Sequence, residues 1–140
     1  MAEQHELLSK EELSQTGEIC QQILSALDSV IIGKPELTRM TLAALIAGGH
    51  ILFEGLPGLG KTVLAKSTAS VLGLTFGRIQ FTPDLLPSDI TGSYILEEGE
   101  NGRTMRFYPG PVFNQLVLAD EVNRASPKTQ SALLEAMSEK

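Results

Sequence analysis

Apolar positions recur with a helical period over the first 31 residues. The stripe consists of Leu13, Gly17, Cys20, Leu24, Leu27 and Ile31, widened by Ile19 and Ile23. Ser9 to Glu12 has the sequence of a capping box, and Leu8 and Leu13 are placed to form a hydrophobic staple across it. The pattern therefore predicts an amphipathic helix that begins at Ser9. We expect Cys20 to act as a small buried apolar group on the helix.

The middle of the chain alternates helical patterns with short apolar runs. Pro35 suits the first turn of a second helix, which the glycines at 48–49 are predicted to end. Residues 50–54 form a short apolar run that suits a buried parallel strand. A third helix is expected over 63–72, followed by a second strand over 74–81. This alternation is typical of an α/β fold.

The last third of the chain predicts a hairpin, a strand and a helix. Residues 83–89 are expected to form a turn or a short helix. Segments 93–96 and 104–108 flank a polar link that contains Asn-Gly, a pattern that favours a β-hairpin. The apolar run at 116–121 predicts a third buried strand, and Ser126-Pro127 should open a final helix.

Composition is that of a globular protein without an obvious nucleic-acid surface. The 140 residues are 42% hydrophobic and 20% charged, with a formal net charge of −6. Lys and Arg are scattered, which disfavours nucleic acid as a partner. A single cysteine excludes an intrachain disulfide, and the polar N-terminus is unlike a secretory signal, so we expect a cytoplasmic protein. No apolar run reaches the length of a membrane-spanning helix, so membrane insertion is not expected.

The main chemical signal is the segment Gly55-Leu56-Pro57-Gly58-Leu59-Gly60-Lys61-Thr62, which fits the phosphate-loop pattern G-x-x-x-x-G-K-[ST]. Gly58 and Gly60 allow a tight turn whose backbone N–H groups point at phosphate oxygens. Lys61 would reach the β- and γ-phosphates, and the Thr62 hydroxyl would bind Mg²⁺. The expected setting between a strand and a helix disfavours the alternative, a glycine-rich turn without a ligand. We therefore expect a nucleoside triphosphate site.

A second signal is the acidic pair Asp120-Glu121 at the end of the predicted third strand, about 58 residues after Thr62. In phosphate-loop folds the first acid orients Mg²⁺ and the second can polarise the water that attacks the γ-phosphate. A solvated acidic turn is the alternative for such a pair. Its spacing from the phosphate loop favours the metal and water-activating roles, with Asp120 as the metal residue and Glu121 as the catalytic one.

With both motifs in place, the chain resembles the MoxR family of AAA+ ATPases from about Val30 to Lys140. The resemblance is carried by Ile32-Gly33, the Gly55–Thr62 loop, and residues 78–89, 110–113 and 118–125. It implies a phosphate-loop NTPase fold, a doubly wound parallel sheet flanked by helices, with the hairpin at 93–108 as an insertion. It also implies ATP and Mg²⁺ as cofactors, a hexameric ring, chaperone-like protein remodelling and a von Willebrand factor A domain partner.

The resemblance also fixes the expected site. The nucleotide-binding residues would be Ile32, Gly33, Gly55, Leu56, Pro57, Gly58, Leu59, Gly60, Lys61, Thr62 and Val63, with adenine lying against Ile32-Gly33. Thr62 and Asp120 would hold the metal, and Glu121 and Lys61 would be catalytic. The domain organisation would be an N-terminal helical region at 1–29 and a partial AAA+ domain at 30–140.

In the family the sheet has a fourth strand, and later elements include sensor 1, an arginine finger, sensor 2 and a helical lid. None has a counterpart here, so the chain alone is expected to bind nucleotide without efficient turnover. Two other functions remain open: a nucleotide-binding interaction module without catalysis, and a small-molecule kinase. Asp120-Glu121 disfavours the kinase, which needs no water-activating acid at that place.

Overall fold

The computed structural model describes residues 9–55, 60–99 and 102–139. Contacts within the chain divide it into two compact units, Met1–Leu72 and Gly73–Lys140, which are described separately. The expected division into residues 1–29 and 30–140 stays a prediction.

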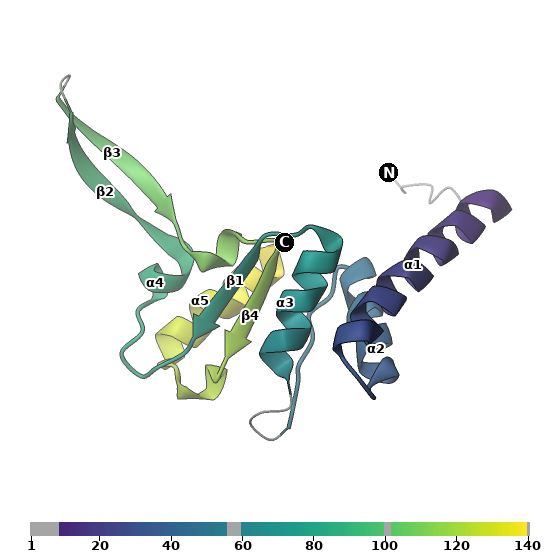
Figure 1. Ribbon diagram of the computed structural model, residues 1–140. Helices are drawn as coiled ribbons and strands as arrows, with labels where there is room; N and C mark the ends of the chain where they lie inside the picture. The colour runs from purple at the N-terminus through teal and green to yellow at the C-terminus, as the bar shows by residue number, and fades with distance from the viewer. Residues whose placement is uncertain (1–8, 56–59, 100–101, 140) are drawn as a thin grey trace, which may run out of the picture. The chain divides into compact units, whose positions relative to one another are not determined.

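The first unit is helical, with helices α1 (Lys10–Val30), α2 (Pro35–Ile46) and α3 (Lys61–Leu72) (Figure 1). The predicted capping box is confirmed: the Ser9 hydroxyl accepts from the Glu12 backbone N–H at 3.2 Å, and the Glu12 carboxylate accepts from the Ser9 backbone N–H at 2.8 Å. Hydrogen bonds from the Ser9 hydroxyl and the Ser9 backbone N–H to the Glu12 carboxylate lower the pKa of Glu12. Pro35 stands in the first turn of α2, as predicted.

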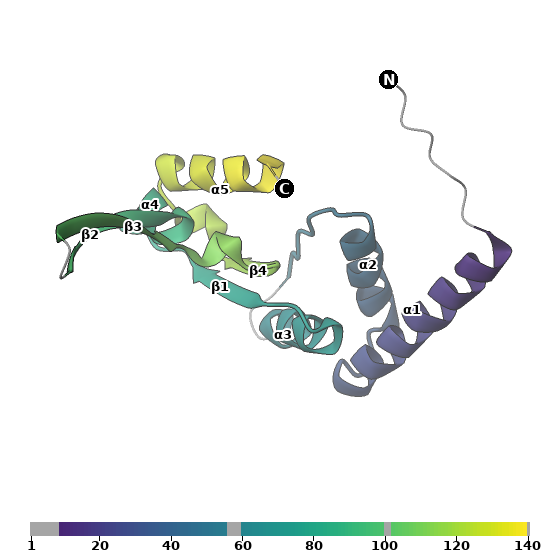
Figure 2. The same cartoon turned by 90° about the horizontal axis from the view of Figure 1, so that it is seen from above.

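The helix predicted from the apolar stripe is confirmed, but most of the stripe is exposed and Cys20, which we expected to be buried, is not fully so. Only Leu27 is buried, while Leu13 and Ile19 are 55% and 56% exposed and Cys20 is half-buried. In Figure 1 and Figure 2, α2 lies beside the C-terminal half of α1, where the Thr38 hydroxyl donates to the Asp28 carboxylate at 2.7 Å. A stripe is buried only where another element covers it. The predicted staple partner Leu8 lies outside the described residues.

The strand predicted at 50–54 is also wrong, since residues 51–54 carry no strand structure. Leu52 is 83% exposed and Ile51 is 37% exposed. An apolar run becomes a strand only when a neighbouring strand supplies its hydrogen-bond partners. No strand in the described ranges pairs with 51–54.

The second unit contains a parallel pair, β1 (Phe76–Gln80) and β4 (Leu116–Asp120), in a register that places Gln80 opposite Asp120. One face of this pair packs on α5 (Pro127–Glu139) and α4 (Pro87–Thr91) (Figure 2). The core there consists of Ile79, Phe81, Ile90, Ala125 and Leu133, with Val117 and Ala119 against it. The expected α/β fold with parallel strands is confirmed.

The predicted hairpin is confirmed as β2 (Gly92–Gly99) and β3 (Gly102–Pro109), which pair antiparallel. Both views show it extending away from the β1–β4 pair. Its base is tight: Gly92 has a φ of 91°, and a Cβ on it would lie 2.2 Å from the Tyr108 carbonyl oxygen. Two 3-10 turns, η1 (Pro111–Phe113) and η2 (Val122–Arg124), flank β4.

Candidate functional site

The described part of the phosphate loop is its C-terminal end, where α3 begins. Gly60 has a φ of 82°, a left-handed conformation that glycine adopts without steric cost, and its carbonyl accepts the Leu64 N–H at 2.9 Å. The Lys61 ammonium donates to the Gly55 carbonyl at 3.0 Å, so the lysine side chain is directed back toward Gly55. The loop residues Leu56, Pro57, Gly58 and Leu59 lie outside the described residues.

A cavity of about 410 Å³ lies next to this helix start, within the first unit. Its lining includes Gly33, Lys34, Leu37, Phe53, Lys61 and Leu64. The volume falls in the usual range for small-molecule sites, about 300–1,000 Å³. Apolar side chains and a cation at one cavity suit a ligand with a flat apolar part and an anionic part.

The cavity brings together some predicted site residues and leaves out others. Gly33 and Lys61, 28 positions apart in sequence, both line it. Ile32 is 84% exposed and does not line it, and neither does Val63, which is 50% exposed. Thr62 is half-buried in the first turn of α3.

Sequence reasoning missed Leu37 and Phe53 as cavity residues. Leu37 was part of a helical pattern and Phe53 part of an apolar run, so both read as ordinary core positions. Their positions in the sequence could have indicated the cavity: Leu37 is four residues after Gly33, and Phe53 is two residues before the phosphate-loop segment. Apolar residues that flank a phosphate site are the natural contacts of a base.

In the second unit, the acidic pair marks the end of β4. Asp120 is the last strand residue, while Glu121 has φ 57° and ψ 41°, the left-handed conformation. Glu121 is the one non-glycine residue with positive φ within 9–55, 60–99 and 102–139. Such a backbone costs about 1–2 kcal/mol in a residue with a Cβ and is often found at functional sites.

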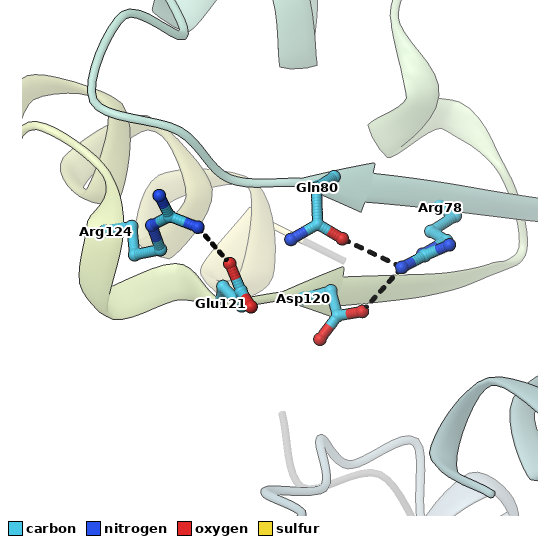
Figure 3. A network of polar contacts seen from close by, with 5 residues as sticks. All are labelled: Arg78, Gln80, Asp120, Glu121 and Arg124. Atoms are coloured by element: carbon cyan, nitrogen blue, oxygen red, sulfur yellow. Dashed lines mark hydrogen bonds and ion pairs between the residues drawn. The ribbon is translucent and has the colours of Figure 1, made fainter. Parts of the chain in front are cut away.

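Each acid of the pair is held by a different arginine (Figure 3). Arg78 Nη2 lies 2.8 Å from Asp120 Oδ2 and also 2.8 Å from Gln80 Oε1. Arg124 Nη1 lies 2.8 Å from Glu121 Oε2. The two neighbouring carboxylates thus belong to two distinct ion pairs.

The residues predicted to hold a metal carry side-chain oxygen atoms, the ligand type that Mg²⁺ prefers. Within the described residues, no group of three or more His, Cys, Asp or Glu side chains could hold a metal by itself. Mg²⁺ does not need such a cage, since it commonly takes one or two protein oxygens, phosphate oxygens and water. The Asp120 carboxylate at the end of β4 is an oxygen of that kind in the second unit. The Thr62 hydroxyl is one in the first unit.

Comparison with known proteins supports one family. Residues 50–140 match the family model "ATPase family associated with various cellular activities (AAA)". Over 115 residues, 81% of this chain and 35% of the relative, the chain is 54% identical to the protein YeaC of Bacillus subtilis. It is 47% identical to "Chaperone MoxR1" of Mycobacterium tuberculosis over 111 residues, 79% of this chain and 29% of that protein.

A structural match agrees with these sequences. The crystal structure of a candidate ATPase from Cytophaga hutchinsonii superposes with a TM-score of 0.73 and 41% identity, covering 92% of this chain and 41% of that one. The chain thus spans about a third of the length of the curated relatives it matches. No described helix has the length and apolar character that crossing a membrane requires. The predicted AAA+ fold is confirmed, and the chain belongs to the MoxR family of AAA+ ATPases.

Proposed function

We propose that this chain binds ATP with Mg²⁺ and, as part of a longer protein, hydrolyses it to drive chaperone-like remodelling of a protein partner. The observation that carries the proposal is the cavity of about 410 Å³ that Gly33 and Lys61 share. Its apolar lining suits a purine base, and its lysine suits phosphate. Family membership and the name of the chaperone MoxR1 supply the remodelling part.

Each residue has a role that its chemistry supports. Backbone N–H groups from Gly58 to Thr62 would cradle the phosphates, with the positive end of α3 behind them. Lys61 would leave the Gly55 carbonyl, its partner at 3.0 Å, for the stronger charge of a phosphate oxygen. The Thr62 hydroxyl and the Asp120 carboxylate would hold Mg²⁺, which when bound neutralises charge that develops on the phosphates.

Glu121 would orient the attacking water and accept its proton. For that, its carboxylate must be free of Arg124, which holds it at 2.8 Å. Both groups are about half exposed, and an ion pair of that kind contributes little, about 0–1 kcal/mol. Release of Glu121 from Arg124 is therefore a small energetic step compared with nucleotide binding.

The test compares two lysines of the same helix. Lys61→Ala should weaken ATP binding about 10- to 150-fold, the range for losing a hydrogen bond to a charged group. Lys66→Ala is the matched control, because Lys66 is exposed and does not line the cavity. Isothermal titration calorimetry with Mg-ATP measures both. Equal affinity of Lys61→Ala and wild type would overturn the proposal.

A second candidate function is nucleotide binding without catalysis. It is favoured by the ion pairs that engage both Asp120 and Glu121. Steady-state phosphate release distinguishes the two: a full-length protein that binds ATP with the Lys61 dependence above and releases no phosphate would be a binding module.

We extend the proposal to assembly and location on the basis of family membership alone. We propose that the full-length protein forms a hexameric ring, acts with a von Willebrand factor A domain partner and is located in the cytoplasm. Light scattering of the full-length protein with and without nucleotide tests the ring. A protein that stays monomeric in both conditions would contradict it.

A further inference from the structure

Arg78 is a charged residue for which the proposed function has no role. It lies on β1, two positions before Gln80, and its side chain is 45% exposed. Along β1 the buried positions are Gly77 and Ile79, so Arg78 and Gln80 share the opposite face. The parallel register places Asp120 on that same face, beside Gln80.

A single nitrogen of Arg78 joins three side chains into one cluster. Its Nη2 donates to Asp120 Oδ2 and to Gln80 Oε1, both at 2.8 Å (Figure 3). The carboxylate that would take the metal thus already has a counter-charge, with a neutral acceptor next to it. Asp120 itself is 32% exposed, and a cation that takes its Oδ2 must displace the guanidinium.

We propose that Arg78 is a positioning residue that competes with the divalent cation for Asp120 and so sets how strongly nucleotide binding depends on the metal. The inference rests on the proposed function, in which Asp120 serves Mg²⁺. Gln80 makes the exchange possible, because it can keep one hydrogen bond to the guanidinium when Asp120 turns to the metal. Arginine suits this arrangement since its planar group offers several fixed donors.

A purely structural ion pair would behave differently. Arg103 and Glu98 on the hairpin form such a pair at 2.7 Å, and both side chains are about 70% exposed. Pairs of this type change stability little and do not affect a distant equilibrium. Loss of Arg78 should instead change one quantity in particular, the gain in nucleotide affinity that Mg²⁺ brings.

The expected size follows from Coulomb's law. One positive charge roughly 6 Å from a divalent ion weakens its binding about tenfold in the dielectric of water, and salt reduces this. Removing the charge of Arg78 should therefore raise the metal-dependent gain in affinity by about three- to tenfold. Arg78→Lys keeps the charge, so it should stay close to wild type.

The experiment measures ATP dissociation constants of the full-length protein by calorimetry, once with Mg²⁺ and once with EDTA. The ratio of the two constants is the metal-dependent gain. We expect it to rise in Arg78→Gln, to stay near the wild-type value in Arg78→Lys and to be unchanged in the control Arg103→Gln. In an Asp120→Asn background, Arg78→Gln should raise the ratio less than it does in the wild-type background, because the contested carboxylate is gone and only the repulsion between the guanidinium and the ion remains.

The outcomes separate this inference from the proposed function. A ratio in Arg78→Gln equal to or below that of wild type overturns the role of Arg78 while ATP binding stands. An equal rise in the Asp120→Asn background also overturns it, since Arg78 would then act elsewhere. If wild type binds no ATP in either condition, the proposed function fails and this inference fails with it.

Discussion

Glu121 combines a proposed catalytic role with a left-handed backbone, and two substitutions separate these properties. Glu121→Gln keeps the Cβ and the strain but removes the base. Glu121→Gly removes the base and also the strain, which costs about 1–2 kcal/mol at φ 57°. Because glycine loses about 0.5–1 kcal/mol through its greater freedom when unfolded, the net gain should lie between about 0 and 1.5 kcal/mol.

Turnover and stability should therefore respond differently to the two changes. Phosphate release should fall roughly 10²–10⁴-fold in both variants, the range for a positioned general base. The free energy of unfolding should stay within about 0.5 kcal/mol of wild type in Glu121→Gln, and be higher in Glu121→Gly than in Glu121→Gln. The matched control is Glu98→Gln, an exposed acid on the hairpin.

The assays are steady-state phosphate release, ATP calorimetry and urea unfolding on the full-length protein. ATP affinity should survive in both variants, because phosphate contacts come from the loop and Lys61. Wild-type turnover in Glu121→Gln would refute the catalytic assignment. A Glu121→Gly variant less stable than Glu121→Gln would refute the account of backbone strain.

Three further predictions concern the second unit. Thr129 is fully buried and its hydroxyl donates to the Leu85 carbonyl at 2.7 Å. Thr129→Val should therefore lower the free energy of unfolding in urea by about 1–3 kcal/mol, and Thr129→Ser should lower it less. Equal losses in the two variants would show that this hydrogen bond does not contribute to stability. Gly92→Ala should destabilise the hairpin base by about 2 kcal/mol or more, since its Cβ would lie 2.2 Å from a carbonyl oxygen. Gly102→Ala, with open space around its Cβ, should cost about 1 kcal/mol. Hydrogen exchange of the hairpin amides measures both, and equal protection in the two variants would contradict the argument. The Tyr108 hydroxyl donates to Glu97, which raises the pKa of the phenol. The absorbance of Tyr108 should therefore titrate at a higher pH than that of an ordinary tyrosine, and the titration should shift back in Glu97→Gln. An unchanged titration in that variant would exclude Glu97 as the cause.

Local signals predicted the elements whose determinants lie within a few residues. Ser9 and Glu12 mark the start of α1 through reciprocal hydrogen bonds, and Pro35 marks the start of α2. The Asn-Gly link predicted the hairpin, although its tip at 100–101 lies outside the described residues. In each case the sequence contains both partners of the deciding interaction.

Predictions failed where the deciding partner lies far along the chain. Leu52 belongs to an apolar run that no described strand joins, and Leu13 is 55% exposed although Leu27 of the same stripe is buried. An apolar pattern indicates which residues can be buried, but they are buried only where another helix or strand packs against them. For the same reason, apolar periodicity overestimated how much of α1 is inside the unit.

Sequence motifs identified the candidate groups of the site but not their partners. Lys61 and Asp120 follow from spacing, whereas Arg78 and Arg124 carry no motif-based signal as partners of acids. Arg78 meets Asp120 only through the parallel register of β1 and β4, 42 positions apart in sequence. Such neighbours on adjacent strands can be identified only when the pairing and register of the strands are known.

The period-two alternation of β1 and β4 has an evolutionary consequence. Residues 77 and 79, with 117 and 119, form the packed side, and residues 78 and 80, with 120, form the side that carries the polar cluster. A one-residue insertion or deletion in either strand would exchange these sides. In β1 it would bury an arginine and expose an isoleucine in the same event, so neither change could be selected alone. Changes in length should accumulate instead in the hairpin, where added residues displace neither the core nor the acids.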